Sequence, residues 1–386
     1  MKKYISIIIV VLFVMSSCDK LQLDNSRFKS LFSITVIFPE DYEMPKERVN
    51  VKITNIHTNK NIQTHLDANG CLSIEIESGI YNITVSNDSN DISEKYNGSI
   101  ENIAISENNK NAIIYLNKAI ISNTWLISEI HFTANETPNG YPYFQDGYIE
   151  IYNNSDKTLY ADNLCISRAY TLTNEDYSIW ANLKDDIVPF YILSINGNGH
   201  EYPVPAGGKL LIAVSGINHN NENPESKYDL SKADFEIYSP NSLSGIDAPD
   251  IKNINIEYCA VDIAPIIFSG CEALFIFKPD GNLRGFLNGR SVVARENNGD
   301  NVNSYAIPIA NIIDAVHIGE SEKELSMKVF PSYIDAGHTY CNIGKYNFVS
   351  KRKVLKTEDK REILQDTNNS TNDFLPNQLS KYIIQQ

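Results

Sequence analysis

The sequence lacks the motifs that most readily identify an enzyme. Its seven histidines form no H-E-x-x-H metal motif, and no G-x-S-x-G segment supplies a nucleophilic serine. Gly207-Gly208-Lys209 matches part of a phosphate-binding loop, but Pro203 replaces its first glycine. Leu210 stands where a hydroxyl group would hold magnesium. These absences favour a protein that binds over one that catalyses.

Cysteine is scarce, with six in 386 residues, and no two cysteines have C-x-x-C spacing. This excludes a zinc knuckle and a dense disulfide framework. Cys259 and Cys271 could pair in an oxidising compartment, and buried free thiols are the alternative.

Long apolar runs are also missing from the sequence. The run from Tyr4 to Met15 spans about 12 residues, whereas a membrane-crossing helix needs ~20.

That short run lies between Lys2-Lys3 and Ser16-Ser17-Cys18. A basic end, an apolar core and small residues before a cysteine are typical of a bacterial lipoprotein signal peptide, here residues 1–17. Cleavage would leave Cys18 to carry fatty acyl chains such as palmitate, with residues 18–27 as a tether. We therefore predict a protein lipid-anchored to the cell envelope, at the outer membrane or cell surface. Asp19 fits inner-membrane retention as well as surface export, and an ordinary secretory signal is the alternative.

Positive charge is under-represented. The chain has 33 basic and 48 acidic residues, and without residues 1–17, which hold two lysines and no acid, its net charge is −17. Nucleic acids are bound by neutralising phosphates with Lys and Arg, so a nucleic-acid partner is excluded. The 22 tyrosines and the shortage of Ala and Leu runs favour strands over helices.

Residues 28–118 alternate between apolar and polar side chains, as in Phe32, Ile34 and Val36. Turn signals such as Asp67-Ala68-Asn69-Gly70 separate these short segments, which together predict a β-sandwich. The pattern over 30–117 resembles the carboxypeptidase-regulatory-like, or transthyretin-like, sandwich modules of extracellular bacterial proteins. This resemblance implies a spacer and no active site.

The second region, 119–386, resembles a lamin-tail domain in the order of its segments. Asp162-Asn163-Leu164 replaces the usual Gly-Trp, and long insertions fall at 168–203 and 215–270. The segments that carry this resemblance are Trp125–Ile130, Asp146–Asp156, Pro205–Ala213 and the closing Gln365–Phe374. Residues Asp366–Asp373 are dense in side chains that bond their own backbone, which predicts a tight closing loop.

The predicted fold class is therefore all-β: an Ig-like or transthyretin-like sandwich followed by a lamin-tail-like, Ig-like sandwich with long loop insertions. The whole chain resembles an uncharacterised family of Gram-negative envelope lipoproteins, which has no established activity to transfer.

In the segment Tyr148–Tyr152, Ile149 and Ile151 point to one face and the remaining side chains to the other. The alternation predicts one core face and one partly wet face. Helix is expected only in short pieces, for example Ser231–Tyr238, with Ser231 as its cap.

Glu129 and Glu150 are the nearest approach to a catalytic carboxylate pair. A glycosidase needs two such groups about 5–9.5 Å apart, flanking a sugar. The lamin-tail resemblance implies framework glutamates on adjacent strands at these positions. A structural role is therefore our main interpretation, and a glycan hydrolase that uses this pair, or an aspartate cluster at 229–250, is the alternative.

Two further groups of residues are candidate sites. Calcium takes six to eight oxygen ligands, and acidic loops supply them, although an ordinary solvated loop is the alternative. The candidate metal residues are Asp229, Asp234, Asp247 and Asp250. Exposed aromatic rings stack on sugars or anchor partner proteins, while buried packing is the alternative. The candidate binding residues are Tyr141, Tyr143, Phe144, Trp180 and Tyr191.

These features predict a non-catalytic, lipid-anchored protein that binds a ligand or partner. Two kinds of protein fit this prediction: an accessory to a TonB-dependent outer-membrane β-barrel transporter, and a glycan-binding surface adhesin. No cofactor is expected beyond a structural Ca²⁺.

Overall fold

The computed structural model describes residues 29–40, 42–58, 60–87, 96–118, 124–238, 245–261, 270–296, 299–323, 325–342 and 347–384. The predicted signal peptide, Cys18 and the tether lie outside the described residues. Within that part of the chain, no helix combines the length and apolarity that crossing a bilayer would require. The fold is all-β, as the sequence predicted.

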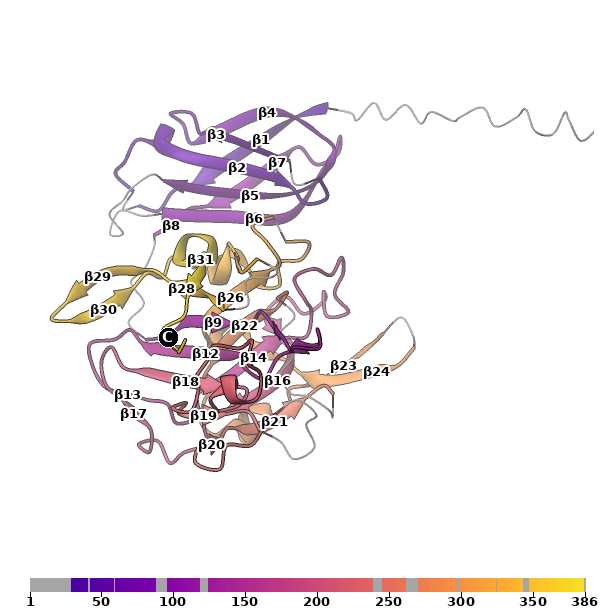
Figure 1. Cartoon of the computed structure of the whole chain (residues 1–386). Helices are drawn as coiled ribbons and strands as arrows, with labels where there is room; N and C mark the ends of the chain where they lie inside the picture. Colours follow the sequence, from indigo (N-terminus) through magenta and orange to yellow (C-terminus); the bar gives the residue numbers. More distant parts are fainter. Residues whose placement is uncertain are drawn as a thin grey trace, which may run out of the picture.

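The first eight strands form an N-terminal sandwich, drawn in indigo and purple in Figure 1. One sheet has three strands and the other has five. Their order is β4 (Cys71–Glu77), β1 (Lys29–Ile37) and β7 (Asn111–Tyr115) in the first sheet, and β3 (Asn61–His65), β2 (Val49–Asn55), β5 (Gly79–Asn87), β6 (Tyr96–Ile105) and β8 (Asn117–Lys118) in the second.

The alternation read from the sequence builds the core of this sandwich. Phe32 and Ile34 of β1 are fully buried against Ile53 and Ile83 of the facing sheet. Burial of each such side chain stabilises the fold by about 1.5–3 kcal/mol. Gly70 lies in the predicted turn with φ +80°, and a Cβ atom there would approach the Phe38 ring to 2.5 Å. Only glycine fits this turn without strain.

The rest of the chain forms a larger, C-terminal sandwich of two sheets. The seven-stranded sheet runs β20 (Lys252–Asn253), β19 (Phe235–Glu236), β18 (Lys209–Ala213), β12 (Tyr148–Asn153), β9 (Trp125–His131), β28 (Phe348–Arg352) and β31 (Phe374–Leu379). The six-stranded sheet runs β21 (Asn255–Cys259), β16 (Pro189–Ser194), β14 (Cys165–Ala169), β22 (Ala273–Phe277), β26 (Ile312–Gly319) and β27 (Thr339–Tyr340).

Ile151 of β12 and Ile276 of β22 belong to the core between these sheets. The segments predicted as loop insertions are strands in part, since β16 lies inside the six-stranded sheet and β19–β21 extend both sheets. The outer faces are covered as well. Tyr148, Glu150 and Tyr152 are 0–1% exposed, so the predicted wet face of β12 is wrong. The segments around Tyr228 and the C-terminal residues cover it.

Short hairpins and helical turns complete the described part of the chain. The paired strands are β10 (Asn135–Glu136) with β11 (Pro142–Tyr143), β13 (Leu159–Tyr160) with β17 (Pro203–Val204), β15 (Asp186–Ile187) with β25 (Ile307–Pro308), β23 (Ser291–Arg295) with β24 (Asn301–Tyr305), and β29 (Val354–Glu358) with β30 (Arg361–Leu364). The helices are α2 (Leu283–Leu287), α3 (Ser332–Asp335) and α4 (Ser370–Asp373), with 3-10 turns η1 (Lys46–Arg48), η3 (His219–Asn221) and η4 (Ile309–Asn311).

The helix predicted at Ser231–Tyr238 is absent, because this segment is a turn that leads into β19. Ser231 donates to Asp229 Oδ1 within that turn instead of capping a helix.

The cysteines do not form disulfides among the described residues. Cys259 and Cys271 remain separate thiols, and Cys165, Cys271 and Cys341 are buried.

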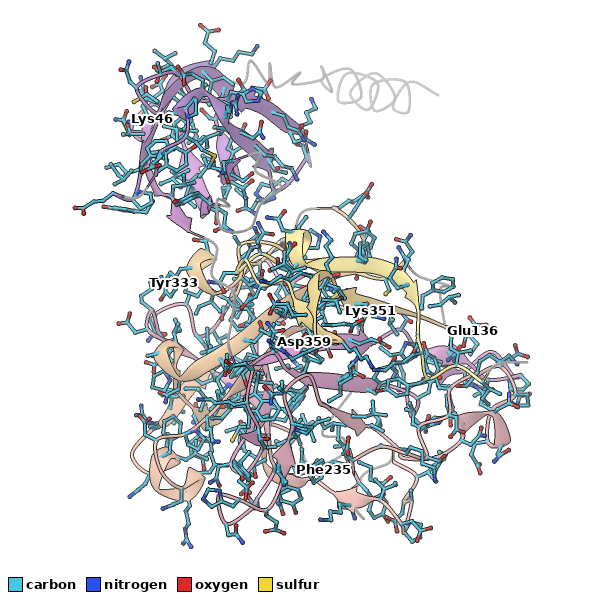
Figure 2. All side chains as sticks on the ribbon, turned by 90° about the vertical axis from the view of Figure 1, so that its left-hand side faces the viewer. Lys46, Glu136, Phe235, Tyr333, Lys351 and Asp359 are labelled. Atoms are coloured by element: carbon cyan, nitrogen blue, oxygen red, sulfur yellow. The ribbon has the colours of Figure 1, made fainter. Side chains whose placement is uncertain are left out.

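The two sandwiches contact each other along β6. Asn97 donates to the carbonyl of Thr367, and Ser332 donates to the carbonyl of Ser99 at 3.3 Å. Figure 2 shows Tyr333, next to Ser332, on the side of the larger sandwich that faces the smaller one. The two sandwiches are thus joined by hydrogen bonds as well as by the chain itself.

Candidate ligand-binding site

An open cavity of about 320 Å³ lies beside the outer face of the six-stranded sheet. Its floor is apolar and is built by Ala169, Ile187 and Phe330, while Thr171 and Asp186 add polar groups. The segments that enclose it are the loop after β14, the strand β15, the turn η4 and residues 327–331. Concave sites with mostly apolar walls and a few polar groups are typical of small-molecule binding.

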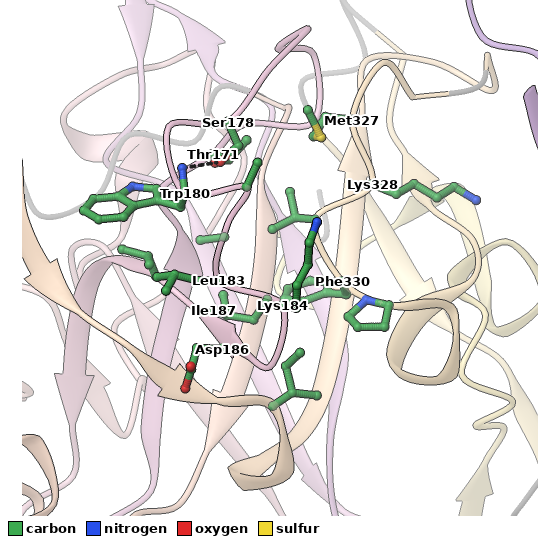
Figure 3. Close-up of a pocket in the computed structure, with 16 residues that line it drawn as sticks. Thr171, Ser178, Trp180, Leu183, Lys184, Asp186, Ile187, Met327, Lys328 and Phe330 are labelled. Atoms are coloured by element: carbon green, nitrogen blue, oxygen red, sulfur yellow. Dashed lines mark hydrogen bonds between the residues drawn. The ribbon is translucent and has the colours of Figure 1, made fainter. Parts of the chain in front are cut away.

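Trp180 forms one side of this cavity. Figure 3 shows its indole at the left edge of the lining residues and Met327 at the upper right, with the ammonium group of Lys184 below Met327. Trp180 is 7% exposed, and its backbone N–H donates to Ser178 Oγ at 3.1 Å. The indole Nε1–H is buried and has no acceptor among the described residues.

An aromatic neighbour holds Trp180 from behind. The Tyr170 ring meets the indole edge to face at a centroid distance of 6.0 Å. Tyr170 in turn donates to Glu296 Oε1 at 2.7 Å, which fixes its ring. Burial, reinforced by this bond, raises the pKa of Tyr170 well above its ordinary value, so the hydroxyl stays a donor. The indole is therefore held in place before any ligand arrives.

The opposite wall of the cavity is held by the buried residue His317. Its Nε2 accepts from the backbone N–H groups of Val329 and Phe330 at 2.9 and 3.1 Å. This leaves Nδ1–H to donate to Asp335 Oδ2 at 3.1 Å. Burial would raise the pKa of Asp335, but the bonds from His317 and the backbone hold it below its ordinary value. The imidazole thus acts as a rigid support for the wall and does not reach the cavity.

The two lysines that line the cavity differ in whether their amines face a ligand. Lys184 is exposed, and in Figure 3 its amine extends into the opening. Lys328 is buried and donates to the carbonyl of Ala336 at 2.6 Å, so its amine points away from the cavity. Among the described lining residues, Lys184 therefore supplies the ammonium group at the opening, and Asp186 supplies a carboxylate.

Of the five aromatic residues proposed from the sequence, only Trp180 lines this cavity. Tyr191 is 1% exposed and packs in the core between the sheets. Tyr141 is 70% exposed in the β10–β11 hairpin, and Phe144, which follows that hairpin, is half-buried. Tyr143 is buried and its hydroxyl meets His219 Nδ1 at 2.8 Å. The predicted aromatic group therefore does not form one surface.

The His219 imidazole beneath that hairpin gives a pH-dependent prediction. Burial lowers the pKa of His219 from 6.5 to about 4. The unfolded chain takes up this proton as pH falls below 6.5 and the folded chain does not, so stability is full above that pH and declines toward pH 4. Linkage makes the loss about 3 kcal/mol. Urea unfolding at pH 7, 5.5 and 4 should show this loss in the wild type and not in His219→Gln. Parallel pH curves for the two proteins would contradict it.

The four aspartates proposed as calcium ligands do not form a site. Asp229 accepts from Ser231, and Asp234 accepts from the backbone N–H of Leu211 at 2.8 Å. Asp247 and Asp250 are exposed in another loop. Among the described residues no three His, Cys, Asp or Glu side chains are grouped so as to hold a metal ion. The physical reason is that a hydroxyl and a backbone amide already occupy Asp229 and Asp234, while Asp247 and Asp250 lie exposed in a different loop.

Glu129 and Glu150 are cross-strand neighbours but face no open cleft. They are 0% and 1% exposed. Tyr148 donates to Glu129 Oε1 at 2.5 Å, while Tyr382 and Lys381 cover Glu150. Burial would raise the pKa of Glu150, but the ammonium groups of Lys381 and Lys209 hold it below its ordinary value. A general acid needs a raised pKa and a substrate within reach, so the interpretation of this pair as glycosidase acids is wrong.

The fold and cavity define a class: an all-β protein of two sandwiches with an open, partly apolar cavity on the larger one. Residues 205–380, less than half of the chain, match the family model described as "Protein of unknown function (DUF4876)". No curated protein matches the chain.

Two solved structures are similar to different degrees. A crystal structure of a DUF4876 family protein from Bacteroides thetaiotaomicron VPI-5482 is 23% identical, with a TM-score of 0.59, over 91% of this chain and 95% of that one. It shows that the fold is shared. BcpA, the major pilin subunit of Bacillus cereus, is 10% identical over 74% of this chain and 97% of that one. Its TM-score of 0.15 is too low to carry an argument.

Sequence reasoning missed most of the residues that line the cavity. Asp186, Met327 and Phe330 come from segments more than 140 residues apart, and no local pattern connects them. Lys184 follows Trp180 by four residues, so an exposed lysine close to an isolated tryptophan was the one available signal.

Proposed function

We propose that this protein is a non-catalytic, lipid-anchored component of the bacterial cell envelope that binds a small ligand in the Trp180 cavity. The observation that carries the proposal is the cavity itself, where the Trp180 side chain, held by Tyr170, borders an apolar floor. Aromatic and apolar walls supply affinity, and a few polar groups supply orientation.

The envelope address rests on the N-terminal motif and the acidic net charge. Acyl chains on Cys18 would hold the protein at the membrane, with the N-terminal sandwich between the lipid and the cavity. The partner we propose is an outer-membrane β-barrel transporter of the TonB-dependent type, which would receive the ligand. The sequestered Glu129 and Glu150 give the hydrolase alternative no support.

A steric block of the cavity tests this function. Ala181 lines the cavity and is exposed, so Ala181→Trp would fill the space without disturbing the core. We expect the full-length lipoprotein, purified from gently solubilised envelopes, to retain a small molecule that Ala181→Trp loses by at least tenfold. Mass spectrometry of the eluate provides the measurement.

Val293→Trp is the matched control, because Val293 is 62% exposed on β23 and does not line the cavity. This variant should retain the same ligand as the wild type. Equal retention by Ala181→Trp and Val293→Trp would contradict the cavity as the binding site.

A further inference from the structure

A second cavity, of about 350 Å³, lies between the two sandwiches. Figure 1 shows the N-terminal sandwich above the yellow C-terminal segments, with β6 closest to them. One wall is the outer face of the five-stranded sheet at β3, β2 and β5, and the other is built from residues 336–338 and 369–372. Domain interfaces are frequent places for ligand sites.

The sheet wall is a regular grid of polar side chains. Lys52 of β2 lies opposite Gln63 of β3 and Thr84 of β5 in the strand register. Because side chains alternate along a strand, these three share the face turned away from the core, while Val51 and Val85 fill the core. Next to this row, Asn50 lies opposite Ser86, Thr54 lies opposite Asn82, and all four line the cavity.

The opposite wall is the closing loop that the sequence singled out as dense in turn residues. It presents Asn369, Thr371 and Asn372 to the cavity. Asn369 caps α4 by accepting from the backbone N–H groups of Thr371 and Asn372 at 3.1 and 3.4 Å. Thr371 Oγ donates to the carbonyl of His338 at 3.0 Å. The positions of these side chains are therefore fixed.

Buried carboxylates brace the loop from behind. Asp335 Oδ1 accepts from the backbone N–H of Ser370 at 2.8 Å, and its Oδ2 accepts from the Ser370 hydroxyl at 2.8 Å. Asp373 accepts from both the backbone N–H and the hydroxyl of Thr367 at 2.8 Å. A wall that is rigid before binding loses little conformational entropy when a ligand arrives.

The chemistry of both walls selects the ligand. Amide and hydroxyl side chains can donate and accept, as the hydroxyl groups of a sugar do. The charged groups are mixed in sign, with Lys52 and Lys328 against Glu322, so the cavity favours no single charge. Among the described residues no Trp, Tyr or Phe lines it, so recognition would rest on hydrogen bonds. We propose that this inter-sandwich cavity is a binding site for a neutral saccharide, separate from the Trp180 cavity.

Binding of the full-length protein, in detergent micelles, to an array of neutral oligosaccharides tests this inference. One arm of the array carries hexose and N-acetylhexosamine oligomers, and a second carries glycan strands of the bacterial cell wall. Comparison of the two arms shows whether the saccharide is a free oligomer or comes from the cell wall. We expect saturable binding in at least one arm. Thr84→Trp, which would fill the cavity from β5, should weaken that binding at least tenfold.

Thr357→Trp is the matched control, since Thr357 is exposed on β29 and does not line the cavity. Gln63→Trp, on the exposed strand β3, repeats the test if Thr84→Trp fails to fold. Ala181→Trp should leave saccharide binding unchanged, because Ala181 lines the Trp180 cavity and not this one. A failure of the saccharide proposal can therefore be told apart from a failure of the proposal for the Trp180 cavity. Absence of binding in both arms, preference for charged glycans or peptides, or equal binding by the cavity variants would overturn the inference.

Discussion

Replacing Arg352 by methionine should lower the free energy of unfolding of the C-terminal sandwich by about 3–5 kcal/mol, because it leaves a buried charge without its partner. Arg352 is 3% exposed. Its guanidinium donates to Asp314 Oδ2 at 2.6 Å and to the carbonyl of Ile127 at 2.7 Å, and it lies 4.7 Å from the centre of the Phe374 ring. Urea unfolding followed by Trp emission measures the loss.

Lys356→Met provides the matched control for this variant. Lys356 pairs with Glu358 at 2.7 Å, but both side chains are about half exposed, so the pair contributes little. The unfolding midpoint of this variant should stay close to that of the wild type. The double variant Arg352→Met/Asp314→Leu should recover only part of the loss, because it removes Asp314 together with its partner but leaves Asp373 buried near the lost guanidinium. A loss below 1 kcal/mol in Arg352→Met alone would refute the role given to this cluster.

Replacing Cys18 by alanine should release the protein from the membrane, with at least a tenfold shift from the membrane fraction to the soluble fraction. The reason is that the acyl chains proposed on Cys18 would be lost with its sulfur, and these chains are the proposed anchor. Fractionation followed by immunoblotting measures the shift, and labelling with a palmitate analogue should disappear in parallel.

Cys71→Ala is the control for this second prediction. Cys71 is a half-buried free thiol on β4, so its loss removes a cysteine without touching the signal. Its fractionation and labelling should match those of the wild type. Unchanged membrane association of Cys18→Ala would show that another feature anchors the protein.

Local sequence patterns predicted the strands of the N-terminal sandwich well. Phe32, Ile34 and Val36 alternate with polar residues because one face of β1 is core and the other is wet. The same rule failed for β12, where Tyr148 and Glu150 are buried on the outer face. Segments distant in the sequence cover that face, and no period within a single strand reveals such a cover.

The closing loop shows what turn chemistry can predict. Its density of Asp, Asn, Ser and Thr indicated a tight loop, and Asp373 does bind the backbone and hydroxyl of Thr367. The pattern did not indicate that Asn97, 270 residues earlier, would donate to the same loop. Contacts of this kind depend on how the sandwiches meet, which local sequence does not encode.

The candidate site was predictable only in part, for a related reason. Trp180 was proposed for binding because it lies in the first predicted insertion, 168–203, where an exposed aromatic ring could stack on a sugar or anchor a partner. Tyr191 was proposed on the same grounds and proved to be core, because β16 is a strand of the six-stranded sheet. Aromatic residues serve packing and binding equally well, so their type alone does not separate the two roles.

The emission of Trp180 tests the central claim most directly. Trp125 is 3% exposed in the core, so Trp125→Phe leaves Trp180 as the sole indole of the chain. Titrating this full-length variant with the small-molecule extract of its own envelopes should shift the Trp180 emission in a saturable way, and adding Ala181→Gln to narrow the cavity should weaken the response. An emission spectrum that stays unchanged throughout the titration would contradict the Trp180 cavity as the binding site.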